Sequence, residues 1–340
     1  MGEPPIPEKP ASGRYGPYEV IQEIGRGGMG SVYRARHVET GTEHALKVVR
    51  PKDDPEKVRR AFRRLEREAE TLEAIEPHPG IVRLHSFGME GTHPWYSMDL
   101  IRGKPLSALL RDGPLEPERA ARIVSAVARA IEHVHTHGVV HRDIKPGNIL
   151  IDRDDRPHMC DFGLAFDAMA VEGPIQIGAA VGTLAYMAPE QVVDPAETEE
   201  DELRPAVDVY GLGAVLYIAL TGAPPFGELE GEELVEAIID REPERPRRRN
   251  PAVPRALDAI CRRALAKRPE ERFASSEELA DELDRFVAGE PIHTRVRPSR
   301  RLRSERPARA PGAFPIGWAL LVIIALAGIV VFGLVRALGS

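Results

Sequence analysis

The segment HRDIKPGN, residues 141–148, constrains this chain more than any other segment, because it places an acid, a base and an amide in one tight loop. Asp143 can accept a hydrogen bond from a hydroxyl group and orient it, and Lys145 can neutralise negative charge on a transferred group. Asn148 offers an amide oxygen to a divalent cation. Asp161 opens the segment DFG and supplies a second oxygen ligand, followed by a glycine that allows a flexible turn. The sequence therefore predicts a site for metal-assisted group transfer.

A glycine-rich element, GRGGMGSV at residues 25–32, lies between two segments that alternate like strands. Glycine lets backbone N–H groups approach phosphate oxygens closely, although a glycine turn in an ordinary hairpin would show the same pattern. A dinucleotide-binding turn would be followed by a helix, whereas SVYRAR alternates like a strand. Lys47 lies in the apolar strand HALKVV, where its ammonium needs an anion; an exposed strand lysine is the alternative. The order of the two elements favours phosphate binding.

The predicted elements divide the chain into a strand-rich beginning and a helix-rich body. Strand-like alternation covers residues 18–49 and returns in IVRLHSFG and PWYSMDLI, with one charged helical stretch at about 55–75. Residues 116–137 carry an apolar stripe at helical spacing. With 340 residues, 42% of them apolar, the chain can bury a substantial core, and its composition excludes a disordered chain. Two cysteines cannot form a disulfide framework, and a net charge of −7 argues against nucleic acid as a partner.

The order and spacing of these motifs resemble those of the bacterial, eukaryotic-like (Hanks-type) serine/threonine protein kinases. The resemblance extends over residues 18–286, which is most of the chain. It implies an α+β, bilobal kinase-like fold, with a β-rich small lobe at about 18–98 and an α-helical large lobe at about 103–286. It also implies transfer of the γ-phosphate of ATP, with Mg²⁺, to Ser or Thr hydroxyls of protein substrates.

The resemblance assigns catalytic and metal-binding roles to residues of this sequence. Asp143 is expected to be the catalytic base, and Lys145 and Lys47 are the other expected catalytic residues. Asn148 and Asp161 are expected to hold Mg²⁺. The rate acceleration would come from positioning and charge stabilisation, without a covalent enzyme intermediate.

The resemblance also implies a set of nucleotide-binding residues. The β-strand lysine would bind the α/β-phosphates and pair with a helix glutamate, for which Glu68 is the best match and Glu66 the competing one. Met98 falls at the gatekeeper position, and Asp99 and Ile101 would present backbone groups to adenine. The full expected set is Ile24, Gly25, Arg26, Gly27, Gly28, Met29, Gly30, Ser31, Val32, Ala45, Lys47, Glu68, Met98, Asp99 and Ile101.

Further residues match the family pattern in the large lobe. Thr183 resembles the residue that hydrogen-bonds the catalytic aspartate and lysine of serine/threonine kinases. Asp208 matches the acid that supports the catalytic loop. Glu190, at the end of the motif APE, is expected to pair with Arg272.

The segment before Thr183 departs from the family pattern. Arg142 is typical of kinases that are switched on by a phosphate on this activation segment. Residues 164–182, however, contain no Ser, Thr or Tyr. We therefore expect activation that does not depend on phosphorylation of the segment, either with Asp167 or Glu172 offering its charge to Arg142 or without such a charge.

The end of the chain predicts a membrane anchor. Residues 316–335 carry no charge and would form a helix about 30 Å long, matching the hydrocarbon core of a bilayer; a buried core helix is the alternative. The arginine-rich linker, residues 287–315, precedes this span, and the positive-inside rule then places the kinase domain in the cytoplasm. The linker is either simply solvated or also in contact with anionic lipids. We expect a single-pass inner-membrane protein with a flexible proline-rich leader, residues 1–17, and a short extracytoplasmic tail, residues 336–340.

Several alternatives stay open on the sequence alone. A pseudokinase would be expected to lack Lys47, Asp143 or Asp161, but all three are present. A small-molecule kinase would usually lack the polypeptide-docking segment with GT at 182–183 and APE at 188–190, but this chain contains it. The span contains no GxxxG pair, so it gives no signal for close packing, and a homodimer stays open as a partner. His133, His135 and His137 have no further metal ligand nearby in the sequence. Cys160 is read as a small buried hydrophobic residue in preference to a reactive thiol.

Overall fold

The computed structural model describes residues 13–27, 30–50, 62–63, 66, 75–161, 183–192 and 205–295. The described residues all belong to one compact unit. The predicted linker lies mostly outside the described residues, and the predicted span and tail lie wholly outside them. The same is true of Gly28, Met29, Glu68 and most of the predicted helix at 55–75.

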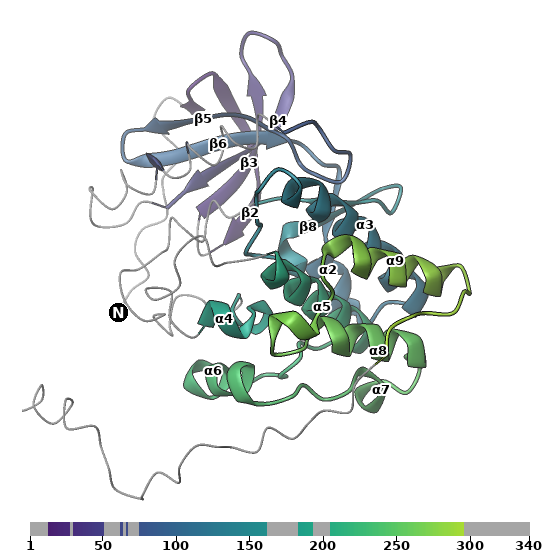
Figure 1. Cartoon of the computed structure of the whole chain (residues 1–340). Coiled ribbons are helices and arrows are strands. Elements are labelled where there is room, and N and C mark those ends of the chain that lie inside the picture. The colour runs from purple at the N-terminus through teal and green to yellow at the C-terminus, as the bar shows by residue number, and fades with distance from the viewer. Residues whose placement is uncertain are drawn as a thin grey trace, which may run out of the picture. The chain divides into compact units, whose positions relative to one another are not determined.

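The strand-rich beginning forms a six-stranded antiparallel sheet in the order β1-β2-β3-β4-β6-β5 (Figure 1). Its strands are Arg14–Tyr15 (β1), Tyr18–Gly27 (β2), Gly30–His37 (β3), Glu43–Val49 (β4), Leu84–Glu90 (β5) and His93–Asp99 (β6). The sheet thus begins at Arg14, inside the segment that the sequence assigns to a flexible leader. Burial of the Tyr15 side chain explains the difference, because this ring packs into the apolar cluster of the sheet.

The alternation of side chains along β4 gives the sheet two different faces. Leu46 and Val48 point into one cluster, which contains Tyr15, Tyr18 and Trp95. Ala45 points to the opposite face and packs with Tyr96, Met98 and Cys160. Since successive side chains of a strand point to opposite faces, Lys47 lies on the same face as Ala45.

The helix-rich body follows the sheet. Its helices are Leu106–Leu109 (α2), Pro117–His135 (α3), Pro189–Val192 (α4), Ala206–Thr221 (α5), Gly231–Asp240 (α6), Pro246–Arg249 (α7), Arg255–Ala264 (α8) and Ser276–Val287 (α9). Short 3-10 turns occur at Leu110–Asp112 (η1), Pro146–Asn148 (η2), Leu184–Tyr186 (η4) and Pro269–Glu271 (η6). A small antiparallel sheet contains Gly103–Pro105 (β7), Ile149–Asp152 (β8) and Pro157–Met159 (β9). The apolar stripe at residues 116–137 corresponds to α3, with Ile123, Val127 and Ile131 buried.

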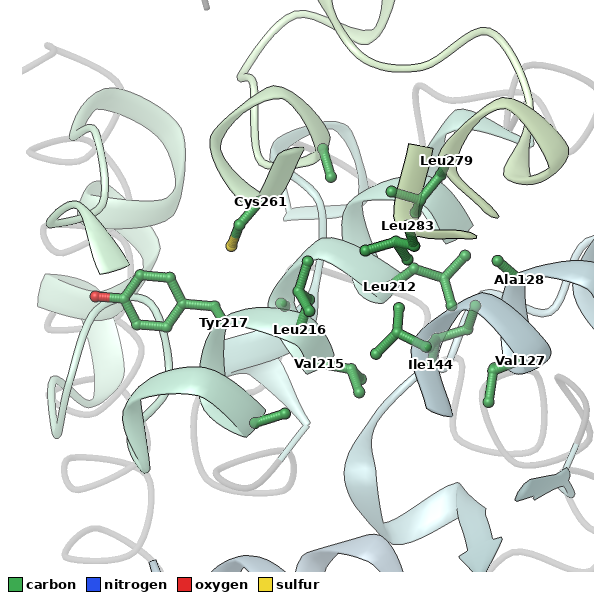
Figure 2. Close-up of a cluster of buried hydrophobic side chains, with 14 of the residues drawn as sticks. Val127, Ala128, Ile144, Leu212, Val215, Leu216, Tyr217, Cys261, Leu279 and Leu283 are labelled. Carbon is green, nitrogen blue, oxygen red and sulfur yellow. The ribbon is translucent and has the colours of Figure 1, made fainter. Parts of the chain in front are cut away.

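The centre of the helical body is α5, which is buried on nearly every side. Figure 2 shows its side chains Leu212 and Leu216 among residues of α3, α8 and α9. Two glycines let neighbouring segments approach this helix. A Cβ added at Gly211 would lie 2.9 Å from the Cβ of Ile144, and one added at Gly213 would lie 2.7 Å from the Cβ of Ala264. Close packing at Gly211 therefore fixes the HRDIKPGN loop, which contains Ile144, against the buried helix.

The structure confirms a bilobal fold with a β-sheet small lobe and a helical large lobe. The predicted strands IVRLHSFG and PWYSMDLI correspond to β5 and β6. Within the ranges that the structure describes, no helix is long and apolar enough to cross a bilayer. The predicted span at residues 316–335 lies outside those ranges.

Candidate active site

The polar groups of the HRDIKPGN loop converge on the carboxylate of Asp143, which is buried. Lys145 Nζ lies 2.8 Å from Asp143 Oδ2 and 2.8 Å from Thr183 Oγ1. Asn148 Nδ2 donates to the same Oδ2 at 3.0 Å and to the backbone oxygen of Asp143 at 2.9 Å. Asp143 Oδ1 is buried without a hydrogen-bond partner among the described residues. One oxygen of this carboxylate is therefore fixed by the loop, and the other can accept a hydrogen bond from a substrate hydroxyl.

The loop is held in shape by Asp208 of α5. Its Oδ2 accepts the backbone N–H of His141 at 2.7 Å, and its Oδ1 accepts that of Arg142 at 2.8 Å. Oδ2 also lies 2.7 Å from His135 Nε2. Arg142 has a φ of 65°, a left-handed conformation that costs a non-glycine residue roughly 1–3 kcal/mol. The amide of Gln191 donates to the Arg142 carbonyl at 2.9 Å, so both sides of this strained peptide are hydrogen-bonded.

Lys47 and Asp161 form an ion pair on the cleft face of the sheet. Lys47 Nζ lies 2.7 Å from Asp161 Oδ2, and the Tyr96 hydroxyl donates to Asp161 Oδ1 at 2.7 Å. Burial disfavours the charged carboxylate, but the Lys47 ammonium and these hydrogen bonds lower the pKa of Asp161 below its ordinary value. Burial likewise disfavours the Lys47 ammonium, yet Asp161 and Tyr96 raise the pKa of Lys47. Both partners of the pair are therefore charged near neutral pH.

The cleft between sheet and helices brings most predicted nucleotide-binding residues together. Its lining includes Ile24, Gly25, Arg26, Gly27, Gly30, Val32, Ala45, Lys47, Met98, Asp99 and Ile101. Of the other predicted catalytic and metal-binding residues, Lys145, Asn148 and Asp161 line the same cleft. Asp143 is buried next to the cleft, behind Lys145 and Asn148, and is not part of its lining. Ser31 is buried beside it, Glu66 is half-buried, and Gly28, Met29 and Glu68 lie outside the described residues.

Asp99 and Ile101, at the end of β6 and just after it, offer backbone groups to the cleft. The N–H of Asp99 donates to the Arg83 carbonyl at 3.0 Å, so the carbonyl is the group that Asp99 can present to a ligand. The Ile101 carbonyl accepts the N–H of Gly103 at 3.1 Å. The Asp99 side chain lies 2.7 Å from His85 Nε2, and this hydrogen bond lowers the pKa of Asp99. The side chain thus points towards His85 on β5 of the small lobe.

The glycines of residues 25–30 do not all serve the same purpose. Gly30 has a φ of 151°, and a Cβ there would lie 2.0 Å from the Val48 carbonyl oxygen. Glycine is thus required at this position by the neighbouring strand β4. At Gly27, in contrast, an added Cβ would meet no described atom within 4 Å apart from its chain neighbours, so this side of Gly27 is open among the described residues.

The oxygen groups beside the ion pair fit a magnesium ion. Asn148 uses its amide nitrogen for Asp143, so its amide oxygen is the atom that it can offer. Asp161 is ionised and supplies carboxylate oxygens. Mg²⁺ prefers such oxygen ligands, usually one or two carboxylates together with substrate phosphates.

The other candidate residues have structural surroundings. Among the described residues no group of three or more His, Cys, Asp or Glu side chains could hold a metal. His133 Nε2 lies 2.8 Å from the Glu76 carbonyl oxygen, and His135 binds Asp208. Cys160 is buried, and burial raises the pKa of its thiol well above the ordinary value, which favours the unreactive neutral form.

Glu190 and Arg272 form the predicted ion pair. The two carboxylate oxygens lie 2.5 Å and 2.7 Å from the two terminal nitrogens of the guanidinium. The same guanidinium donates to the carbonyls of Ala206, Ala266 and Lys267. Arg272 thereby connects the APE motif to α5 and to the turn after α8.

Sequence reasoning missed two residues of the site, Tyr96 and Gln191. Tyr96 lies directly opposite Lys47 in the pairing of β4 with β6. The alternation of PWYSMD places Tyr96 on the same face as Met98, and that pattern was the available signal. Gln191 binds the carbonyl of Arg142, which lies 49 residues earlier in the sequence, and no local sequence pattern predicts such a contact.

Comparisons with known proteins agree with this geometry. Residues 18–283 match the protein kinase domain family. Serine/threonine-protein kinase PknH of Mycobacterium tuberculosis is 39% identical over 268 residues, which cover 78% of this chain and 41% of PknH. PknD of the same organism is 41% identical over 270 residues, with 78% of this chain and 39% of PknD covered. The match thus spans less than half the length of these two relatives.

The fold has solved counterparts as well. The crystal structure of the Mycobacterium tuberculosis PknI kinase domain superposes with a TM-score of 0.61 at 27% sequence identity. The superposition covers 80% of this chain and 96% of the PknI kinase domain. The motif order, the cleft and these likenesses lead to one conclusion: the chain belongs to the protein kinase family and, within it, to the bacterial Hanks-type serine/threonine protein kinases.

Proposed function

We propose that the chain transfers the γ-phosphoryl group of ATP to Ser or Thr hydroxyls of protein substrates. The observation that carries the proposal is that the two oxygens of the Asp143 carboxylate differ. Lys145 and Asn148 fix Oδ2, whereas Oδ1 is buried and has no hydrogen-bond partner within the ranges that the structure describes. An oxygen held in this way can orient an attacking hydroxyl and accept its proton.

The neighbouring residues complete the proposed mechanism. Lys145 bridges Asp143 and Thr183, so its ammonium lies beside the attacking hydroxyl and can neutralise charge on the transferred group. Lys47 turns from Asp161 to the α/β-phosphates of the nucleotide. Mg²⁺, when held by Asn148 and Asp161, neutralises charge on the phosphate oxygens. Most of the rate acceleration then comes from positioning and charge stabilisation.

Phosphate transfer by the purified full chain tests the proposal. The chain is incubated with γ-labelled ATP, Mg²⁺ and a generic basic protein, and the labelled amino acids are identified after acid hydrolysis. Label on phosphoserine or phosphothreonine supports the proposal. A purified, folded chain that labels no protein contradicts it and favours a pseudokinase scaffold, whereas label on a small molecule alone favours a small-molecule kinase.

A membrane anchor at residues 316–335 is the second part of the proposal. The segment is uncharged and follows an arginine-rich linker, which supports one span with the kinase domain in the cytoplasm, where it phosphorylates cytoplasmic proteins in signal transduction. The full chain is expected to stay in the membrane pellet after alkaline carbonate extraction, and a chain ending at residue 315 is expected to appear in the supernatant. Release of the full chain by carbonate would contradict the anchor.

Activity is further proposed to be independent of phosphorylation between residues 164 and 182, which contain no hydroxyl side chain. Phosphatase treatment of the purified chain is expected to change its specific activity by less than about two-fold, because Arg142 has no phosphate to bind there. Mass spectrometry identifies the phosphorylated residues in the same samples. Loss of activity together with a phosphate on Thr183 would refute the idea.

A further inference from the structure

Tyr96 carries a buried hydroxyl that the packing around it does not require. The ring lies among Ala45, Val82, Met98 and Cys160, which are small or apolar neighbours, and only 2% of Tyr96 is exposed. A phenylalanine ring would fill the same space. A buried hydroxyl without a partner costs about 1–3 kcal/mol. The hydrogen bond to Asp161 and the contact with Lys47 therefore make this position favourable for tyrosine.

The pairing of β4 with β6 brings two donors, Lys47 and Tyr96, to the carboxylate of Asp161. Tyr96 and Lys47 lie directly opposite each other on β6 and β4. Lys47 Nζ lies 5.6 Å from the centroid of the Tyr96 ring, and each residue binds a different oxygen of the carboxylate. Because both donors come from neighbouring strands of one sheet, they fix the position and the plane of the carboxylate together.

Asp161 needs such support because its backbone is strained. Its φ is 59°, in the left-handed region that costs a non-glycine residue about 1–2 kcal/mol. Each carboxylate oxygen has two lone pairs, so an oxygen can accept one hydrogen bond and still bind a cation. In the proposed mechanism Lys47 leaves Asp161 for the phosphates of the nucleotide. The Tyr96 hydroxyl is then the donor that stays on the carboxylate.

We propose that Tyr96 is a positioning residue that holds Asp161 in place for Mg²⁺ and so sets the affinity of the site for the metal–nucleotide complex. The inference rests on the proposed function, because it assigns Mg²⁺ to Asp161. Partners that orient a metal-binding side chain typically change metal affinity by about 10–100-fold when they are removed.

The test compares Tyr96→Phe with a matched control, Tyr18→Phe. Tyr18 is equally buried in the same sheet, and its hydroxyl binds Ser86 at 2.9 Å and Ser97 at 2.8 Å. Neither ring lines the cleft, but Tyr18 packs in the apolar cluster on the opposite face of the sheet from Tyr96. Both variants therefore lose a buried, hydrogen-bonded phenol hydroxyl, but only one of these hydroxyls touches Asp161. Thermal unfolding of the full chain establishes that both variants fold.

Calorimetric titration with ADP, once with Mg²⁺ and once with EDTA, gives the readout without any phosphate transfer. Tyr96→Phe is expected to weaken the Mg²⁺-dependent binding of ADP by about 10–100-fold and to leave the binding in EDTA unchanged. Tyr18→Phe is expected to bind ADP like the wild type under both conditions.

Each other outcome overturns a specific claim. Wild-type affinity of Tyr96→Phe for ADP with Mg²⁺ would overturn the positioning role. Equal weakening of that variant with and without Mg²⁺, or equal weakening of Tyr18→Phe, would reduce the effect to packing and overturn the role as well. A wild-type chain whose ADP affinity does not depend on Mg²⁺ would contradict the proposed function itself, and the inference would fall with it.

Discussion

Replacement of Asp143 by Asn is expected to lower kcat for phosphate transfer by about 10²–10⁴-fold, the usual contribution of a general base. Asparagine has nearly the same shape, but its amide cannot accept the hydroxyl proton. Lys145 and Asn148 also lose the negatively charged carboxylate to which they donate hydrogen bonds in the wild type. Since Asp143 contributes no predicted contact to adenine or to the metal, the affinity for ADP should stay within about three-fold of the wild type. Initial rates at saturating ATP, together with ADP titrations, measure both quantities.

Asp154→Asn is the matched control, because Asp154 is an exposed aspartate in the turn between β8 and β9. This substitution removes the same charge from the same lobe and is expected to leave kcat unchanged within about two-fold. An Asp143→Asn variant that keeps more than a tenth of the wild-type kcat would show that Asp143 is not the base.

Replacement of Arg272 by Ala is expected to lower the free energy of unfolding by about 3–5 kcal/mol, the range for breaking a buried ion pair from one side. The side chain of Arg272 has no exposed surface, and its loss leaves Glu190 and three backbone carbonyls without their donor. A loss of this size corresponds to a fall in Tm of about 2–4 °C per kcal/mol for a domain of about this size. Thermal unfolding of the full chain and its variant measures the shift.

The exposed pair of Arg268 and Glu270 provides the comparison for this effect. Its atoms lie 2.5 Å apart, as close as those of the buried pair, but both side chains are more than half exposed. Solvent screens exposed pairs, so they contribute little to stability, and Arg268→Ala should change Tm by far less than Arg272→Ala. Equal Tm values for Arg272→Ala and Arg268→Ala would contradict the claim that burial makes the ion pair of Arg272 important for stability.

The parts of the fold with a strong period could be predicted from the sequence. The stripe of apolar residues at 116–137 became α3, and the alternation in PWYSMDLI became β6. The segment of α5 was harder, because this helix is buried on nearly every side and has no polar face to give a period. The start of the sheet at Arg14 was missed for another reason. A two-residue strand has too few positions for alternation, and Tyr15 is held by packing with residues distant in the sequence.

The residues of the candidate site also differ in how well the sequence predicts them. Asp143, Lys145 and Asn148 could be predicted together because they lie in one loop, and the local spacing fixes their separation. Tyr96 and Gln191 act across 65 and 49 residues of sequence, through the strand register and the packing after the APE motif. Contacts of this kind are set by the tertiary structure, which single-sequence patterns do not encode. The ion pair of Lys47 with Asp161 was likewise not foreseen, since the family pattern pairs that lysine with a helix glutamate.

The central claim is spatial: distant parts of the chain surround one nucleotide so that its terminal phosphate faces Asp143. A crystal structure of the chain with Mg²⁺ and a non-hydrolysable ATP analogue measures this directly. The account predicts the triphosphate beside Lys47, a metal ion on Asn148 and Asp161, and the γ-phosphate on the side of Asp143 Oδ1. A nucleotide bound elsewhere, or one bound in this cleft with its phosphates turned away from Asp143 and Asp161, would contradict it.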